Sequence, residues 1–131
     1  MKRSLLFPFL AAVSVLAAVP FAQAGYKTAE KVSIWDSTRT ASGMLGAVRD
    51  SDDALQYIGC TLYATATQIS GYCAVRNEHN LMRSCSTTAA PQLQAIAGMT
   101  SGSKITFTWG SDGKCEKIWV NNDSFNAQLA P

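Results

Sequence analysis

Large apolar residues alternate with polar ones over several short stretches of this chain. The clearest stretch is 104–110, in which Ile105, Phe107 and Trp109 alternate with Lys and Thr residues. An apolar residue at every second position is typical of a strand that is buried on one face. The same alternation, bounded by Gly, Asn, Asp or Ser, predicts further strands at 31–36, 57–66, 72–77, 81–86 and 115–121.

Two segments depart from this alternation. Residues 89–99 carry Leu93 and Ile96 at helical spacing, with a proline near the start and a glycine near the end, which predicts a short amphipathic helix. Residues 37–53 are rich in Ser, Thr, Gly, Ala and Asp, which predicts a loop with at most a short helical turn at 44–49. The expected fold class is therefore mainly β (α+β), as a small antiparallel sheet or OB-like barrel of five to six strands with one short helix and two disulfides.

The strand patterns also predict which side chains share a face. In 57–66 the apolar residues and Cys60 fall on one face, and Tyr57 and Tyr63 fall on the other. In 72–77 the same rule turns Cys73 inward, and it turns Tyr72 and Arg76 outward. Trp119 is a further candidate for the outer face, although by simple alternation it shares a face with Cys115.

Exposed aromatic rings beside a guanidinium can stack on sugar rings or anchor a protein partner. The candidate binding residues are Tyr57, Tyr63, Tyr72, Arg76 and Trp119. The alternative is that this face forms a second buried layer, covered by the 31–36 strand, by the loop after it or by the helix.

The first residues of the chain have the pattern of a secretory signal peptide. Lys2 and Arg3 precede an apolar run at 5–21, and small residues at A-x-A spacing end at Ala24. A membrane anchor is disfavoured because two prolines interrupt the run, which is about as short as a spanning helix can be. We therefore expect a signal peptide at 1–24 and a single domain at 25–131, periplasmic or secreted, with no membrane anchor after cleavage.

Removal of this leader changes the charge balance. The precursor has eleven Lys and Arg against nine Asp and Glu, and loss of Lys2 and Arg3 leaves nine of each sign. A neutral domain without a cluster of basic residues offers no electrostatic attraction to phosphate backbones or anionic lipids. Nucleic acid is therefore not an expected partner.

Four cysteines in an exported domain predict two disulfides. They are Cys60, Cys73, Cys85 and Cys115. Zinc is disfavoured, because the chain has no C-x-x-C spacing and one histidine. The chain-entropy model gives nested and sequential pairings the same total within its error. A three-residue loop centred on His79 would set Cys73 opposite Cys85, which favours the nested pairs Cys60–Cys115 and Cys73–Cys85.

None of the candidate catalytic motifs is complete. His79 follows Glu78 at an expected hairpin tip, where neighbouring side chains point to opposite sides, and no G-x-S-x-G sequence supplies a nucleophile. The acidic run at 50–53 departs from a calcium loop, because Leu55 and Thr61 stand where that loop needs Gly and Glu. The sequence therefore predicts no catalytic residue, no metal site and no cofactor.

The remaining polar candidates are isolated. Carboxylates for glycoside hydrolysis would have to come from Asp36, Glu78, Asp112, Glu116 or Asp123, and the sequence brings no two of them together. Asn122 begins an N-x-S triplet that matches a glycosylation acceptor.

The run at 47–60 ends in Tyr-Ile-Gly-Cys and is followed by three further cysteines and by the Phe-x-Trp strand at 107–109. In these features the chain resembles small exported bacterial proteins of unknown function. The resemblance implies no activity, substrate or catalytic residue. We therefore expect a non-enzymatic binding module, inhibitor-like, whose partner is a protein or glycan of the cell envelope or extracellular space. The alternative is a small secreted hydrolase that uses carboxylates or a loosely held metal.

Overall fold

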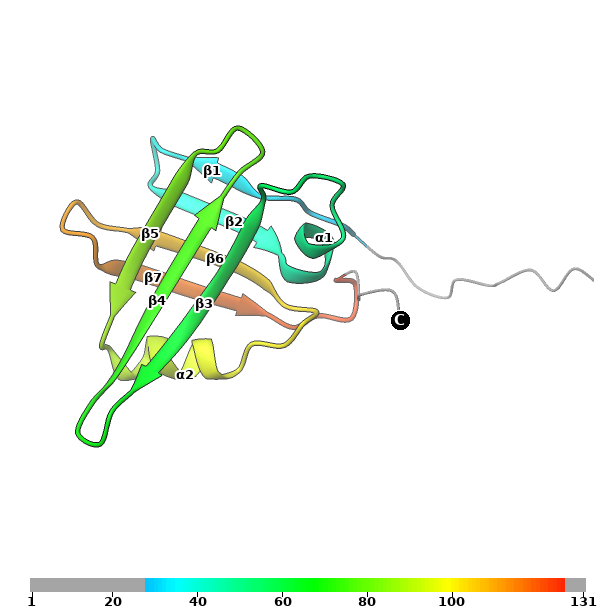
Figure 1. Ribbon diagram of the computed structural model, residues 1–131. Coiled ribbons are helices and arrows are strands. Elements are labelled where there is room, and N and C mark those ends of the chain that lie inside the picture. Colours follow the sequence, from blue (N-terminus) through cyan, green and yellow to red (C-terminus); the bar gives the residue numbers. More distant parts are fainter. Residues whose placement is uncertain (1–27, 127–131) are drawn as a thin grey trace, which may run out of the picture.

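The computed structural model of the protein describes residues 28–126, and within them the chain is mainly β, as the sequence predicted (Figure 1). The predicted signal peptide lies outside the described residues. The elements in chain order are β1 (Ser33–Trp35), β2 (Thr40–Met44), α1 (Leu45–Arg49), β3 (Tyr57–Ala64), β4 (Ile69–Arg76), β5 (Met82–Thr87), α2 (Ala90–Ala97), β6 (Lys104–Trp109) and β7 (Cys115–Asn121).

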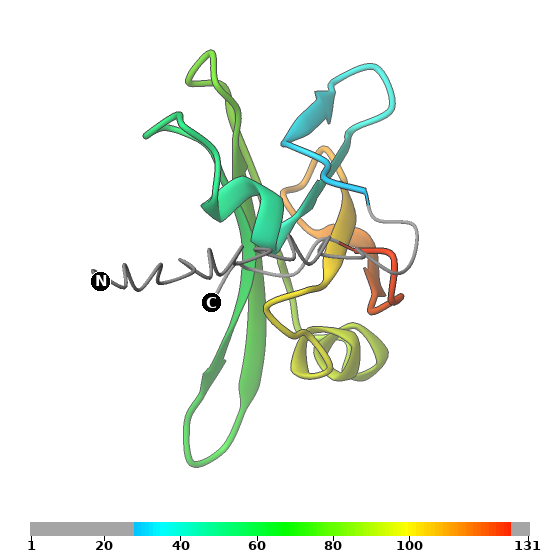
Figure 2. The same ribbon diagram turned by 90° about the vertical axis from the view of Figure 1, so that its right-hand side faces the viewer.

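The strands form two antiparallel sheets, with strand orders β1-β2-β6-β7 and β3-β4-β5. Figure 1 shows the three-stranded sheet crossing in front of the four-stranded one, and α2 lying beside β7, behind the lower part of the β3–β4 hairpin. In the edge-on view of Figure 2, the β3–β4 hairpin extends beyond α2. The described residues thus form a two-layer arrangement of seven strands and two helices, where the sequence predicted five to six strands and one helix.

The strand that sequence reasoning missed is β2, which lies in the segment predicted as a loop. Apart from Met44 its residues are small, but Ala41 pairs with Phe107 and Gly43 pairs with Ile105 in the middle of the four-stranded sheet. A Cβ at Gly43 would lie 3.1 Å from the side chain of Ile58. Small residues are needed here because the large side chains of β6 and β3 fill the space, so tertiary packing overrides the low strand propensity.

The core lies between the facing sides of the two sheets. Its most buried members include Ile105 and Phe107 of β6 and Cys73 and Val75 of β4. The helix α2 packs closely on β4 at Gly71, where an added Cβ would lie 2.6 Å from Ile96 Cδ1. These contacts hold the inner face of the three-stranded sheet against the rest of the molecule and leave its outer face free.

The disulfides are sequential, Cys60–Cys73 and Cys85–Cys115, so the nested pairing favoured by the sequence is wrong. The predicted register was nevertheless right, because Cys73 lies opposite both Cys60 and Cys85. The choice between its two neighbours depends on backbone hydrogen bonding. Residues that face each other in an antiparallel pair alternate between wide hydrogen-bonded pairs and narrow pairs without hydrogen bonds, and side chains approach more closely in the narrow ones.

The two hairpin turns fix this alternation. The amide of Thr65 donates to the carbonyl of Gln68 (2.8 Å), and counting back along β3 from this bonded pair makes Cys60–Cys73 a narrow pair, with a Cα–Cα distance of 4.0 Å. The amide of Asn77 donates to the carbonyl of Leu81 (3.0 Å), and the same count makes Cys73 and Cys85 a wide pair. Cys85 therefore crosslinks instead to Cys115 of the other sheet.

Candidate functional site

The outer face of the three-stranded sheet, which we call the tyrosine face, brings together four of the five predicted binding residues. Tyr57 lies directly opposite Arg76, and Tyr72 lies on the same face, diagonal to Tyr63. The exposed fractions of Tyr57, Tyr63 and Tyr72 are 37%, 66% and 50%. The alternative of a second buried layer is therefore wrong for this face.

The middle of the tyrosine face carries small residues. Gly59, Ala74 and Ser84 lie side by side across the three strands, between the Tyr57–Arg76 pair and the two other tyrosines. No atom lies within 4 Å of a Cβ added at Gly59, so the space above this row is open. The face is thus an open strip with small side chains in its middle and aromatic side chains at both ends, which suits a broad contact better than a small enclosed ligand.

Arg76 is held in place at one end of the strip. Its Nε donates to the side-chain oxygen of Asn80 at 2.6 Å, and Asn80 adopts a left-handed backbone conformation (φ 64°) in the β4–β5 turn. None of the ion pairs among residues 28–126 includes Arg76. Its neighbour across the strand is Met82, which is 50% exposed. A guanidinium without a carboxylate therefore lies between Tyr57 on one side and an exposed thioether on the other.

Trp119 does not join these residues, because it lies on the outer face of the other sheet. A bulge between β6 and β7 makes Trp109 pair with Cys115 while Thr108 pairs with Lys117, so one extra residue enters β7 and reverses the alternation. Cys115 points into the core, whereas Trp119 is 66% exposed and borders a cavity of about 220 Å³. Sequence alternation alone could not detect this bulge.

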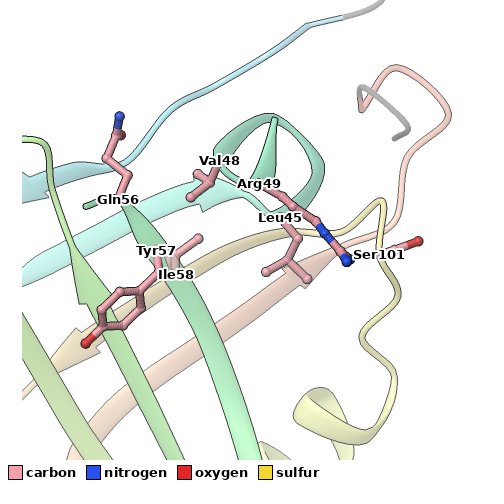
Figure 3. A pocket seen from close by; sticks show the side chains of 7 residues that line it. All are labelled: Leu45, Val48, Arg49, Gln56, Tyr57, Ile58 and Ser101. Atoms are coloured by element: carbon pink, nitrogen blue, oxygen red, sulfur yellow. The ribbon is translucent and has the colours of Figure 1, made fainter. Parts of the chain in front are cut away.

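A pocket at the edge of the three-stranded sheet is a feature that sequence reasoning missed, since it depends on α1 packing beside β3 (Figure 3). Its volume is about 420 Å³. It is lined by Leu45, Val48, Arg49, Gln56, Tyr57, Ile58 and Ser101. In Figure 3 the guanidinium of Arg49 reaches from α1 toward Ser101. Tyr57 belongs both to this pocket and to the tyrosine face, so the two features are continuous.

The candidate catalytic groups are not assembled into a site. His79 Nε2 lies 3.6 Å from Glu78 Oε1 at the tip of the β4–β5 hairpin, where their side chains are 80% and 57% exposed. Asp36 forms a bidentate ion pair with Arg83, in which Nε donates to Oδ1 at 2.8 Å and Nη2 donates to Oδ2 at 2.6 Å. Within residues 28–126, no group of three or more His, Cys, Asp or Glu side chains is placed to hold a metal ion.

The other polar candidates have local structural roles. Asp53 accepts a hydrogen bond from the backbone amide of Leu55 at 2.6 Å, which is the main cause of its lowered pKa. Asn122 Nδ2, the atom that would carry a glycan, donates to the carbonyl of Gly98 at 3.0 Å, and the Asn122 side-chain oxygen accepts from the Ser103 hydroxyl. The Asn122 amide therefore ties the end of β7 to the loop after α2.

Comparison with known proteins gave no family to which the chain could be assigned. No protein-family model, curated protein or solved structure matches it. In the part of the chain that the structure describes, no helix is long and apolar enough to cross a membrane.

Proposed function

We propose that this protein is a non-enzymatic binding module that recognises a partner through its tyrosine face. The observation that carries the proposal is the exposure of Tyr57, Tyr63 and Tyr72 on one side of a single sheet, next to Arg76. No element of the described fold buries these side chains fully. Tyr and Arg are the residue types that most often dominate binding energy at interfaces, because they bury a large area and still form hydrogen bonds.

A protein is the first partner to test, and a glycan is the second. The strip is open, and Met82 extends its apolar surface beside the guanidinium. Aromatic residues, Met and Arg are enriched in protein–protein interfaces, which favours a protein of the cell envelope or extracellular space. Sugar stacking on Tyr63 and Tyr72 would use the same rings, so one set of variants serves both tests.

We further propose that the module works in the periplasm or the extracellular medium. All four cysteines are in disulfides, and such crosslinks persist in oxidising compartments. The sequence pattern at 1–24 supports the same placement.

The test is capture of a partner by the oxidised domain, from envelope and culture-medium protein fractions and on a glycan array. The double variant Tyr63→Ala/Tyr72→Ala should weaken binding to whatever is captured by more than tenfold, because truncation of a central aromatic anchor typically costs about 2 kcal/mol or more. Both rings are exposed, so the thermal unfolding temperature should change little.

Trp119→Ala is the matched control, because Trp119 is as exposed as Tyr63 but lies on the opposite side of the molecule. It should leave capture unchanged. Equal loss in both variants would contradict the proposal, and so would a captured partner whose affinity is insensitive to the tyrosines.

A further inference from the structure

The strand β3 is a long free edge of the three-stranded sheet. It has eight residues and pairs on one side with β4. Among the backbone hydrogen bonds that join separate segments of residues 28–126, none involves a residue of β3. The outward-facing amides and carbonyls of β3 therefore have no backbone partner within the described chain.

The edge of β3 also lacks most of the features that proteins use to prevent strands from pairing with one another, although α1 packs beside its first residues. Such edges are usually short, covered, bulged or marked with charged residues or proline. The sequence of β3 is YIGCTLYA, with no charge and no proline, and its pairing with β4 is continuous. The opposite edge of the same sheet, β5, is covered: the Ser86 amide donates to Gly113 at 3.0 Å, and Cys85 is crosslinked to Cys115.

The phase of the β3–β4 ladder identifies the free backbone groups. In β3 the odd-numbered residues form the hydrogen-bonded pairs with β4, as Thr65 does with Gln68 next to the turn. The even-numbered residues form the narrow pairs, as Cys60 does with Cys73, and they direct their amides and carbonyls away from β4. These residues are Ile58, Cys60, Leu62 and Ala64.

An apolar groove lies beside these same residues. The pocket of Figure 3 borders Ile58, and a second cavity, also of about 420 Å³, borders Cys60 and Leu62. The two cavities share Leu45 and Ser101 as lining residues, so they adjoin along the edge. An added strand would place every second side chain toward this groove while its backbone completed the ladder.

The groove carries a charge at one end. Arg49 is exposed, and it is the one charged residue among those that line the two cavities. None of the ion pairs that the described residues form includes Arg49. The nearby Asp50 and Asp52 line a different cavity. A carboxylate on the incoming segment would therefore meet a guanidinium near the Tyr57 end of β3.

From the free backbone groups, the apolar groove and the isolated arginine, we propose that β3 accepts an extended segment of another protein as an additional strand. The segment has apolar side chains at alternate positions and an acidic residue facing Arg49. This site is separate from the partner contact on the tyrosine face, although Tyr57 borders both.

The experiment is a selection from a random-peptide phage library against the oxidised domain, followed by synthesis of an enriched peptide. We expect enriched sequences to alternate apolar and polar residues and to contain Asp or Glu near one end. On addition of the peptide, amide exchange measured by NMR should slow at Ile58, Cys60, Leu62 and Ala64. Failure to enrich such peptides, or enrichment without this protection, would overturn the proposal.

Two variants test the backbone pairing and the charge contact with the synthetic peptide. Ala64→Pro removes an outward amide at a residue whose side chain is exposed, and Arg49→Glu reverses the charge at the end of the groove. Each should weaken the peptide about tenfold, and Arg49→Glu should gain affinity for the peptide in which Lys replaces the acidic residue.

Lys117→Glu and Tyr72→Ala are the controls, because neither residue borders the groove or lies on β3, and both should bind the peptide as the unaltered domain does. Loss of peptide binding in Tyr72→Ala would assign the peptide to the tyrosine face and overturn the edge site. Concentration-dependent dimerisation that Ala64→Pro abolishes would identify a second copy of the chain as the occupant, which also overturns the proposed partner.

Discussion

The three-stranded sheet is fixed to the molecule on two of its sides and left free on the other two. Its inner face packs on the four-stranded sheet and α2, and its β5 edge is closed by a disulfide, a backbone hydrogen bond and the Asp36–Arg83 ion pair. Its outer face carries the exposed tyrosines, and its β3 edge has no backbone partner among the described residues.

This difference separates stability from recognition within a single sheet. The fixed sides hold the buried residues and the crosslink between the sheets, whereas the free sides hold the aromatic rings, Arg76 and the unpaired backbone groups. Exposed aromatic side chains and unpaired strand edges favour unwanted association. A protein that keeps both beside a well-packed core is therefore expected to use them for binding. Substitutions on the two kinds of side should therefore have opposite effects on folding and binding.

The largest effect on stability is expected from removal of the crosslink between the sheets. Replacing both Cys85 and Cys115 by Ser opens a loop of 30 residues, which corresponds to about 3.6 kcal/mol in the chain-entropy model. Replacing Cys60 and Cys73 opens a loop of 13 residues within one sheet, and the same model gives about 2.9 kcal/mol. Urea unfolding of the two double variants measures the difference.

The variant without the Cys85–Cys115 disulfide should also detach the β5 edge from the other sheet. The Ser86 amide should then lose its protection from hydrogen exchange, because its acceptor, the carbonyl of Gly113, lies in the β6–β7 turn of the other sheet. If the variant without Cys60–Cys73 were the less stable of the two, the disulfide at the β5 edge would not be the main constraint on the sheet.

A smaller effect on stability should distinguish the inner face of the three-stranded sheet from its outer face. Gly71→Ala places a Cβ 2.6 Å from Ile96 Cδ1, and relief of this overlap by moving α2 should cost about 1–3 kcal/mol. Gly59→Ala meets no atom within 4 Å, and it should be neutral or stabilise the strand by up to about 1 kcal/mol. Thermal unfolding of both variants measures this contrast, and equal destabilisation would contradict it.

Period-two alternation was sufficient to predict the class of the fold, the inward and outward sides of β3 and β4, and the opposition of Cys73 to Cys85. It was insufficient where the structure depends on contacts between distant segments. Small residues make β2 a strand because large side chains from β6 and β3 surround it, and the pocket beside β3 forms only when α1 folds against that strand.

The two specific errors have different physical origins. Trp119 was grouped with the tyrosines, but β7 belongs to the four-stranded sheet, so Trp119 is exposed on the outer face of the other sheet. The disulfide pairing was argued from register, yet register leaves two neighbours for Cys73. The phase of hydrogen bonding, which begins at the turns, decides between them. Side-chain patterning contains neither the assignment of a strand to a sheet nor the phase of its backbone.

The smallest effect is expected from the ion pair at the β5 edge. Arg83 and Asp36 join the two sheets through their side chains, which are 34% and 51% exposed, so water and salt screen much of the attraction. Asp36→Asn should therefore lower stability by about 0.5–1 kcal/mol, and the loss should shrink in concentrated salt. Urea unfolding at low and high ionic strength tests both points. A much larger, salt-independent loss would mean that Asp36 shapes the β1–β2 turn itself, and that the closed edge depends on the turn more than on the charge.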